Sequence, residues 1–197
     1  MSVGTPQIRN MGTVGGNLLQ RPRCWYYRNG FGLLGMKDGK GLVREGDNRY
    51  HAIFMTDGNA LFTSPSSMAA PLIALGAQAT ILGERGERTI PVEKLYQIPR
   101  HEGDRELTIG QGEVLSRIFV PAAPGKNATY ETRHLDSCDW PIALASVHLA
   151  IENGKVADAR VVLAGVAPIP YRALEAEATL RGKAVTMDTA AAAAAAT

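Results

Sequence analysis

The most informative stretch of this chain is residues 7–20, which read Gln7-Ile8-Arg9-Asn10-Met11-Gly12-Thr13-Val14-Gly15-Gly16-Asn17-Leu18-Leu19-Gln20. Within it, the segment Thr13–Asn17 offers successive backbone N–H groups, and its two glycines carry no β-carbon that would keep a ligand away. Such a turn can form a concave nest of donors for phosphate oxygens. A plain Gly-Gly turn without a ligand is the alternative, and five residues alone do not separate the two. We expect the segment at a strand-to-helix or strand-to-loop junction, with its amides facing a shared pocket.

The composition of the 197 residues restricts the classes of protein to which the chain can belong. The chain is 45% hydrophobic and 20% charged, with a net charge of +2, which is ordinary for a packed globular protein. The charge balance gives no reason to expect nucleic acid as a partner. Its apolar stretches fall short of the roughly 20 residues that a membrane span needs, and the first residues do not resemble a secretory leader. We therefore expect a cytoplasmic protein with no membrane span.

Hydrophobic periodicity predicts an α+β fold. Asn153-Gly154 between two apolar runs indicates a hairpin, because both central residues of a type I′ turn need positive φ. Alanines 190–196 favour a helical tail by propensity. The remaining predicted elements are a helix over 68–77, strands over 78–82 and 88–92 joined by a loop, strands over 114–120 and 128–133, a short helical or bent segment over 140–145, and a helix over 171–180.

A linker at 121–127, rich in proline, divides the chain in our prediction. Residues 1–122 would form one domain, with a glycine-rich loop insertion at 24–62. Residues 127–187 would form a small C-terminal domain of antiparallel sheet plus helices, followed by the alanine-rich tail 188–197.

Several kinds of catalytic site are excluded by the residue patterns. The chain has neither the phosphate-binding loop that ends in Gly-Lys-Ser/Thr nor the Gly-x-Ser-x-Gly turn of serine hydrolases. The four histidines are scattered without ligand spacing, and each is interpreted as structural or surface-exposed. Asp136 and Asp139 flank Ser137 and Cys138 and are expected to cap a turn. We therefore predict no catalytic side chain and no metal ligand.

The glycine-rich stretch, together with the residues that follow it, resembles a known family. The segments that carry the resemblance are 7–17, 21–28, 45–54, 64–67, 143–147 and 163–168. They are similar to the FAD-binding medium subunit of the molybdenum hydroxylases, the family of xanthine dehydrogenase, aldehyde oxidoreductase and carbon monoxide dehydrogenase. The resemblance covers residues 2–185 and implies the second subdomain of a PCMH-type FAD-binding fold, followed by the family's small C-terminal domain.

The resemblance also implies a cofactor and the residues that bind it. The Thr-Val-Gly-Gly-Asn segment of the family binds FAD, mainly at its pyrophosphate, which assigns Thr13, Val14, Gly15, Gly16 and Asn17 to that role here. A later Ser/Thr-Pro-Ser-Asp segment supplies a polar flavin contact in relatives. In this chain the aspartate position holds Ser67, which is capable of only an uncharged hydrogen bond.

Two departures from the family pattern shape our expectations. Relatives begin with a further subdomain that carries another glycine-rich flavin motif, and this chain starts just ahead of the second motif. We therefore expect residues 1–197 alone to bind FAD weakly or not at all, and the N-terminal piece to restore binding. Some relatives hold a four-iron cluster with four cysteines in the loop at 24–62. Only Cys24 stands there in this chain, and one thiolate cannot hold a cluster.

Two functions follow from the resemblance. In the first, the chain is the flavoprotein subunit of an oxidoreductase and is inactive without its partners. Those partners are a large subunit with the molybdenum cofactor and a small subunit with two-iron clusters, and electrons pass through FAD to NAD or another acceptor. In the second, the chain is a non-catalytic subunit-docking module that binds no FAD by itself.

Overall fold

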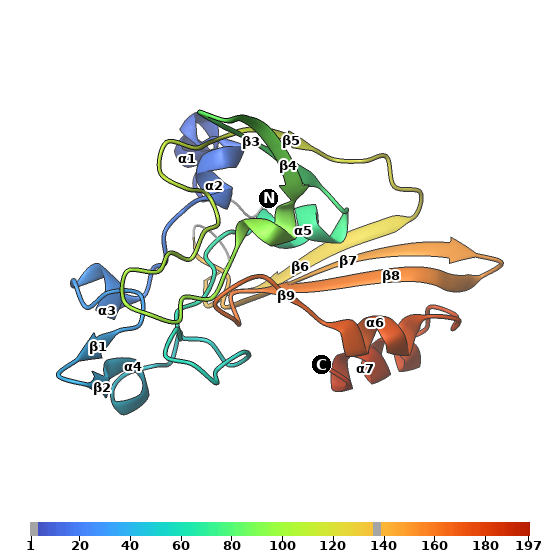
Figure 1. Cartoon of the computed structure of the whole chain (residues 1–197). Coiled ribbons are helices and arrows are strands. Elements are labelled where there is room, and N and C mark those ends of the chain that lie inside the picture. The colour runs from blue at the N-terminus through green and yellow to red at the C-terminus, as the bar shows by residue number, and fades with distance from the viewer. Residues whose placement is uncertain (1–3, 136–138) are drawn as a thin grey trace.

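The computed structural model describes residues 4–135 and 139–197. Over these residues the chain forms a long four-stranded sheet, a three-stranded sheet and a lobe of short elements that surrounds a two-stranded ribbon (Figure 1). The lobe contains α3 (Trp25–Arg28), β1 (Met36–Lys37), β2 (Lys40–Gly41) and α4 (Leu42–Glu45). It occupies the glycine-rich part of the sequence in which we expected little regular structure.

The four-stranded sheet contains the last strands of the chain, in the order β6-β7-β8-β9 and antiparallel throughout. Its strands are β6 (Lys126–Thr132), β7 (Ala143–Glu152), β8 (Lys155–Ala164) and β9 (Tyr171–Arg172). The connection between β7 and β8 is the predicted hairpin, because Asn153 and Gly154 have φ angles of +51° and +77°. It pairs Glu152 with Lys155 and so fixes the register of the two longest strands.

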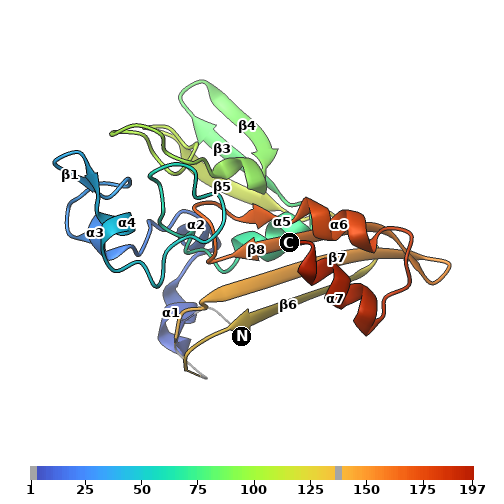
Figure 2. The same cartoon turned by 90° about the horizontal axis from the view of Figure 1, so that it is seen from below.

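Helices cover both faces of this sheet. The helix α5 (Ala69–Ala74) packs on one face, and α6 (Leu174–Leu180) and α7 (Met187–Ala195) lie over the other, as Figure 2 shows from their side. Because successive side chains of a strand point to opposite faces, Val162 joins the core around α5 while Val161 joins the core around α6. The core around α5 therefore contains residues from both halves of the chain.

The three-stranded sheet stands above α5, in the order β4-β3-β5 (Figure 1). Its strands are β3 (Gln78–Gly83), β4 (Gly86–Pro91) and β5 (Val114–Phe119), and the 3-10 helix η1 (Val92–Leu95) follows β4. The N-terminal helix α2 (Val14–Leu18) lies beside it, and α1 (Pro6–Met11) precedes α2 in the chain. Leu18 is fully buried in the same core as α5 and β3, which fixes the glycine-rich segment to this sheet.

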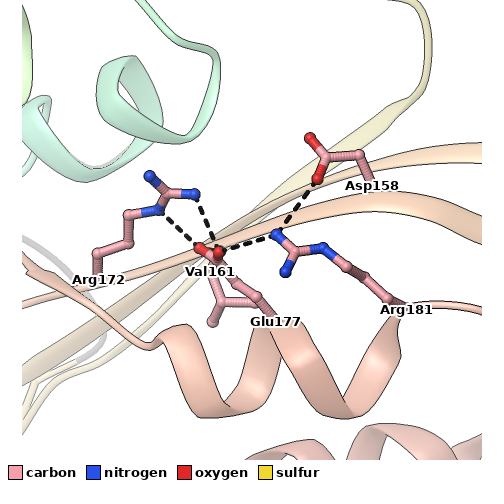
Figure 3. A network of polar contacts seen from close by, with 5 residues as sticks. All are labelled: Asp158, Val161, Arg172, Glu177 and Arg181. Carbon is pink, nitrogen blue, oxygen red and sulfur yellow. Dashed lines mark hydrogen bonds and ion pairs between the residues drawn. The ribbon is translucent and has the colours of Figure 1, made fainter.

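One polar network attaches α6 to the large sheet (Figure 3). The carboxylate of Glu177 is buried and accepts two hydrogen bonds from the Arg172 guanidinium, at 2.8 and 2.9 Å. It also accepts the backbone N–H of Val161 at 3.1 Å and lies 3.5 Å from a guanidinium nitrogen of Arg181. A carboxylate with this many donors can remain charged in a buried position.

Three predicted elements differ from the structure. The helix expected over 68–77 is shorter, because Gly76 takes a left-handed φ of +71° after α5 ends. The prediction of a helical or bent segment over 140–145 was wrong from Ala143 onward. Ala143 is the first residue of β7 and pairs with Thr132. The helix expected over 171–180 starts only at Leu174, since Tyr171 pairs with Leu163 as part of β9.

The fold class itself is confirmed as α+β, with an antiparallel sheet and helices at the C-terminal end. The predicted domain boundary near residue 122 stays a prediction, because α5, which precedes this position, and the large sheet, which follows it, contribute to one hydrophobic core. Among the residues described, no helix has the length and apolar character needed to cross a bilayer.

Candidate functional site

The glycine-rich segment forms a short helix rather than the open turn that we expected. Thr13 caps α2, because its hydroxyl accepts the N–H of Gly16 at 2.9 Å. The element before it is the helix α1, so the expected strand junction was wrong. The local reason is the threonine itself, since a hydroxyl at this position favours the start of a helix. Gly16 is exposed, and the first N–H groups of a helix have no carbonyl partner within it.

Asn17 links this segment to the serine-rich stretch before α5. Its side-chain oxygen accepts the Ser66 hydroxyl at 2.8 Å and the backbone N–H of Met68 at 3.3 Å. The Ser66 oxygen in turn accepts the N–H of Ala69, in the first turn of α5. From the sequence we expected a role for Ser67 and not for Ser66, although both belong to the serine-rich stretch 64–67. The structure thus brings together two segments that are about 50 positions apart.

A cavity of about 520 Å³ opens beside Ser66 and Ser67. The N-terminal half of the chain supplies one wall and the end of the large sheet supplies the other. The lining comes from residues 23–25, 49–51, 53, 63–67, 134, 139–144 and 164–166. Of the predicted site residues, Ser67 lines this cavity. Residues 13–17 do not line it, but Asn17 contacts the lining residue Ser66.

Aromatic rings dominate one side of the cavity. The Trp25 ring meets the rings of Tyr50 and His51 edge-on, with centroids 5.9 and 4.9 Å apart. Trp140 comes from the C-terminal half of the chain. The Arg23 guanidinium stacks over its ring, 3.8 Å from the ring centroid. Asp139 precedes this tryptophan and accepts the backbone N–H groups of Leu135 and Trp140. Asp136 and Cys138 lie outside the described residues.

Arg23 gives the cavity a positive charge. Its side chain donates to Gln20 at 2.7 Å, and in the described part of the chain it forms no ion pair with a carboxylate. Burial and the nearby Arg28 lower the pKa of Arg23 to about 10. A guanidinium that is partly desolvated and lacks an acidic partner favours an anionic or electron-rich ligand.

Cys24 and His51 meet at the same wall, with the thiol sulfur 3.1 Å from Nε2 of the imidazole. No group of three or more His, Cys, Asp or Glu side chains in the described ranges is placed to hold a metal ion. Of the other histidines, His148 is buried in β7, His101 is exposed, and His134 meets the Tyr50 hydroxyl at 3.2 Å.

Comparisons with known proteins match both halves of the chain. Residues 1–123 match the FAD binding domain in molybdopterin dehydrogenase, and residues 128–197 match the CO dehydrogenase flavoprotein C-terminal domain. The aldehyde oxidoreductase FAD-binding subunit PaoB of Escherichia coli is 32% identical over 177 residues, which is 88% of this chain and 55% of that protein. The carbon monoxide dehydrogenase medium chain of Afipia carboxidovorans is 33% identical over 130 residues, which is 65% of this chain and 43% of that one.

A solved structure of carbon monoxide dehydrogenase from Hydrogenophaga pseudoflava has the same arrangement. It superposes with a TM-score of 0.67 at 27% identity, over 98% of this chain and 52% of that one. This chain therefore spans about half the length of the relatives it matches.

Proposed function

Because the chain belongs to the family of FAD binding domains in molybdopterin dehydrogenases, we propose that it is the flavoprotein component of a molybdenum hydroxylase. The observation that carries the proposal is the link from Asn17 to Ser66. It joins the segment proposed to hold the pyrophosphate to a cavity with aromatic walls and a guanidinium.

The residues present fit a flavin. The exposed N-terminus of α2, capped by Thr13, offers backbone donors to phosphate oxygens beside glycines that permit close approach. The cavity of about 520 Å³ lies within the size range of small-molecule sites, and its walls combine apolar rings with few polar groups. Ser67 is a hydroxyl donor in that wall, and Arg23 favours the electron-rich edge of a planar ligand.

FAD supplies the electron transfer chemistry when bound, and the protein's own side chains bind and orient it. In this proposal Thr13, Val14, Gly15, Gly16 and Asn17 hold the pyrophosphate, and no side chain of the chain acts as an acid or base on a substrate. The proposed partners are a large molybdenum-cofactor subunit and a small iron–sulfur subunit. Electrons would pass from the iron–sulfur clusters through FAD to NAD or another acceptor, in the cytoplasm.

Titration with FAD of the chain supplied with the expected N-terminal piece, followed by quenching of flavin fluorescence, tests the assignment. A β-carbon at position 16 would lie 3.0 Å from the Thr13 hydroxyl, so Gly16→Val disturbs the cap and blocks approach to the amides. We expect Gly16→Val to abolish FAD binding. Gly58→Val is the matched control, because a β-carbon there meets no atom within 4 Å. Equal FAD affinities for the two variants would contradict the assignment.

A second function is a docking module that keeps the fold but binds no flavin. It is favoured by the large apolar exposure beside the glycine-rich segment, where Met11 and Ile8 are 81% and 55% exposed. The same titration, with the N-terminal piece supplied, separates the two functions. A colourless chain that gives no quenching, yet co-purifies with the molybdenum subunit, supports the docking module.

A further inference from the structure

Cys24 and His51 lie in the wall of the cavity proposed for the flavin, but no role in flavin binding is assigned to them. Cys24 precedes the first residue of α3, and His51 follows in a loop 27 positions later. Their side chains meet at 3.1 Å on the wall of the cavity. His51 is 7% exposed, and its second ring nitrogen, Nδ1, is buried without a hydrogen-bond partner among the described residues. A sulfur beside a buried imidazole is the arrangement that activates a thiol.

Burial favours the neutral form of both the Cys24 thiol and the His51 imidazole. Burial raises the pKa of the Cys24 thiol above its ordinary 9.0, and burial lowers the pKa of His51 below its ordinary 6.5. At pH 7 the pair is therefore a thiol beside a neutral imidazole, so His51 is free to accept the thiol proton when the sulfur attacks. The Trp25 ring, edge-on at 4.9 Å, holds the imidazole in place.

The surroundings of the sulfur define what can reach it. The cavity is wide enough for a small planar molecule, and its apolar walls include Trp25, Ile53 and Trp140. Arg23, stacked on Trp140, adds a positive charge that attracts carbonyl oxygens. A flat molecule with conjugated carbonyls matches both features.

We propose that Cys24 and His51 form a nucleophilic thiol site for planar, conjugated carbonyl compounds that enter this cavity. In the reaction, the Cys24 sulfur bonds to the β-carbon of a carbon–carbon double bond conjugated to a carbonyl, whose π bond breaks. The thiol proton passes to Nε2 of His51 and then to the α-carbon. The product is a thioether in which atoms and electrons balance without an oxidant. The reaction takes place in the chain without FAD, because a bound flavin would occupy the same cavity.

The first test measures how the reaction rate of Cys24 depends on pH. The probe is N-phenylmaleimide, and the chain carries Cys138→Ser so that one thiol remains. A thiol without a base reacts as the thiolate, so its rate rises about tenfold per pH unit below its pKa. A thiol assisted by His51 reacts at a nearly constant rate from pH 7 to about 8.5, and we expect this constant rate. The charged and titratable groups around the pair are Arg23, Arg28, Arg49, Tyr26, Tyr50, His134, Asp139 and, beside His51, Asp47.

The second test removes the base. His51→Gln should slow the reaction with N-phenylmaleimide at pH 7 by at least about tenfold, because a positioned general base contributes a hundredfold or more. His101→Gln is the control, since His101 is exposed and lies outside this cavity, and its rate should be unchanged. If His51→Gln unfolds the chain, the exposed thiol will react faster. In that case the pH profile of the chain with His51 intact decides whether His51 assists the thiol.

The third test concerns the class of ligand. The ratio of the rate with N-phenylmaleimide to that with N-ethylmaleimide should be several times higher for Cys24 than for glutathione, and Trp140→Leu should lower it. A rate that rises tenfold per pH unit overturns the role of His51. A ratio equal to that of glutathione overturns the preference for planar ligands.

Discussion

Replacing Glu177 by alanine should strongly destabilise the protein. Its carboxylate is 1% exposed and is shared by Arg172, Arg181 and the backbone N–H of Val161 (Figure 3). The alanine variant leaves the Val161 N–H buried without an acceptor and leaves the Arg172 guanidinium unpaired. The contact between α6 and β8 then lacks its polar connection.

The magnitude follows from the burial of the two partners. Removing one member of a buried ion pair costs about 3–5 kcal/mol. Arg172 is 31% exposed, so water solvates part of the charge that is left behind, and the lower end of that range applies. We expect a loss of about 3 kcal/mol in the free energy of unfolding. For a chain of this length that corresponds to a fall in Tm of about 6–12 °C.

Urea unfolding followed by circular dichroism measures this loss directly. Glu175→Ala is the matched control, because Glu175 belongs to the same helix but is exposed, and its replacement should cost less than about 1 kcal/mol. In a double-mutant cycle, Arg172→Met should cost much less in the Glu177→Ala background than in the unchanged chain. Equal losses for the two glutamate variants would refute the role assigned to the buried carboxylate.

The other predictions concern the core, the cavity rim and acid stability. Tyr96→Phe removes the hydroxyl that donates to the Leu18 carbonyl at 3.0 Å, and urea unfolding should show a loss of about 1–2 kcal/mol. Gly165→Ala should cost roughly 1–3 kcal/mol in the same assay, because its φ is +79° and a β-carbon would lie 2.8 Å from a backbone carbonyl oxygen. Arg88, and secondly a backbone N–H, lower the pKa of Glu113 from 4.5 to about 2. The stability from this pairing is present above pH 4.5 and is lost as the pH falls toward 2. Between pH 5 and pH 3 the Tm of Glu113→Gln should therefore fall less than that of the unchanged chain.

The sequence by itself determined the elements whose signals are local. Asn153-Gly154 predicts its hairpin because a type I′ turn depends only on the φ angles of two neighbouring residues. The strands of the small sheet, the α+β class and the helical tail follow in the same way from periodicity and propensity. The family resemblance of the glycine-rich segment is also a property of contiguous residues, and the match over residues 1–123 confirms it.

Only the tertiary structure decided the elements and contacts that join distant residues. The sequence around Tyr171 is compatible with a helix. Tyr171 nevertheless belongs to a strand, because its backbone pairs with that of Leu163 on β8. Ser66 rather than Ser67 bonds Asn17 because the approach of α2 to α5 selects one hydroxyl. The contact of Cys24 with His51 likewise arises where two loops meet. No local pattern encodes such contacts, since they depend on how separate segments pack around a common core.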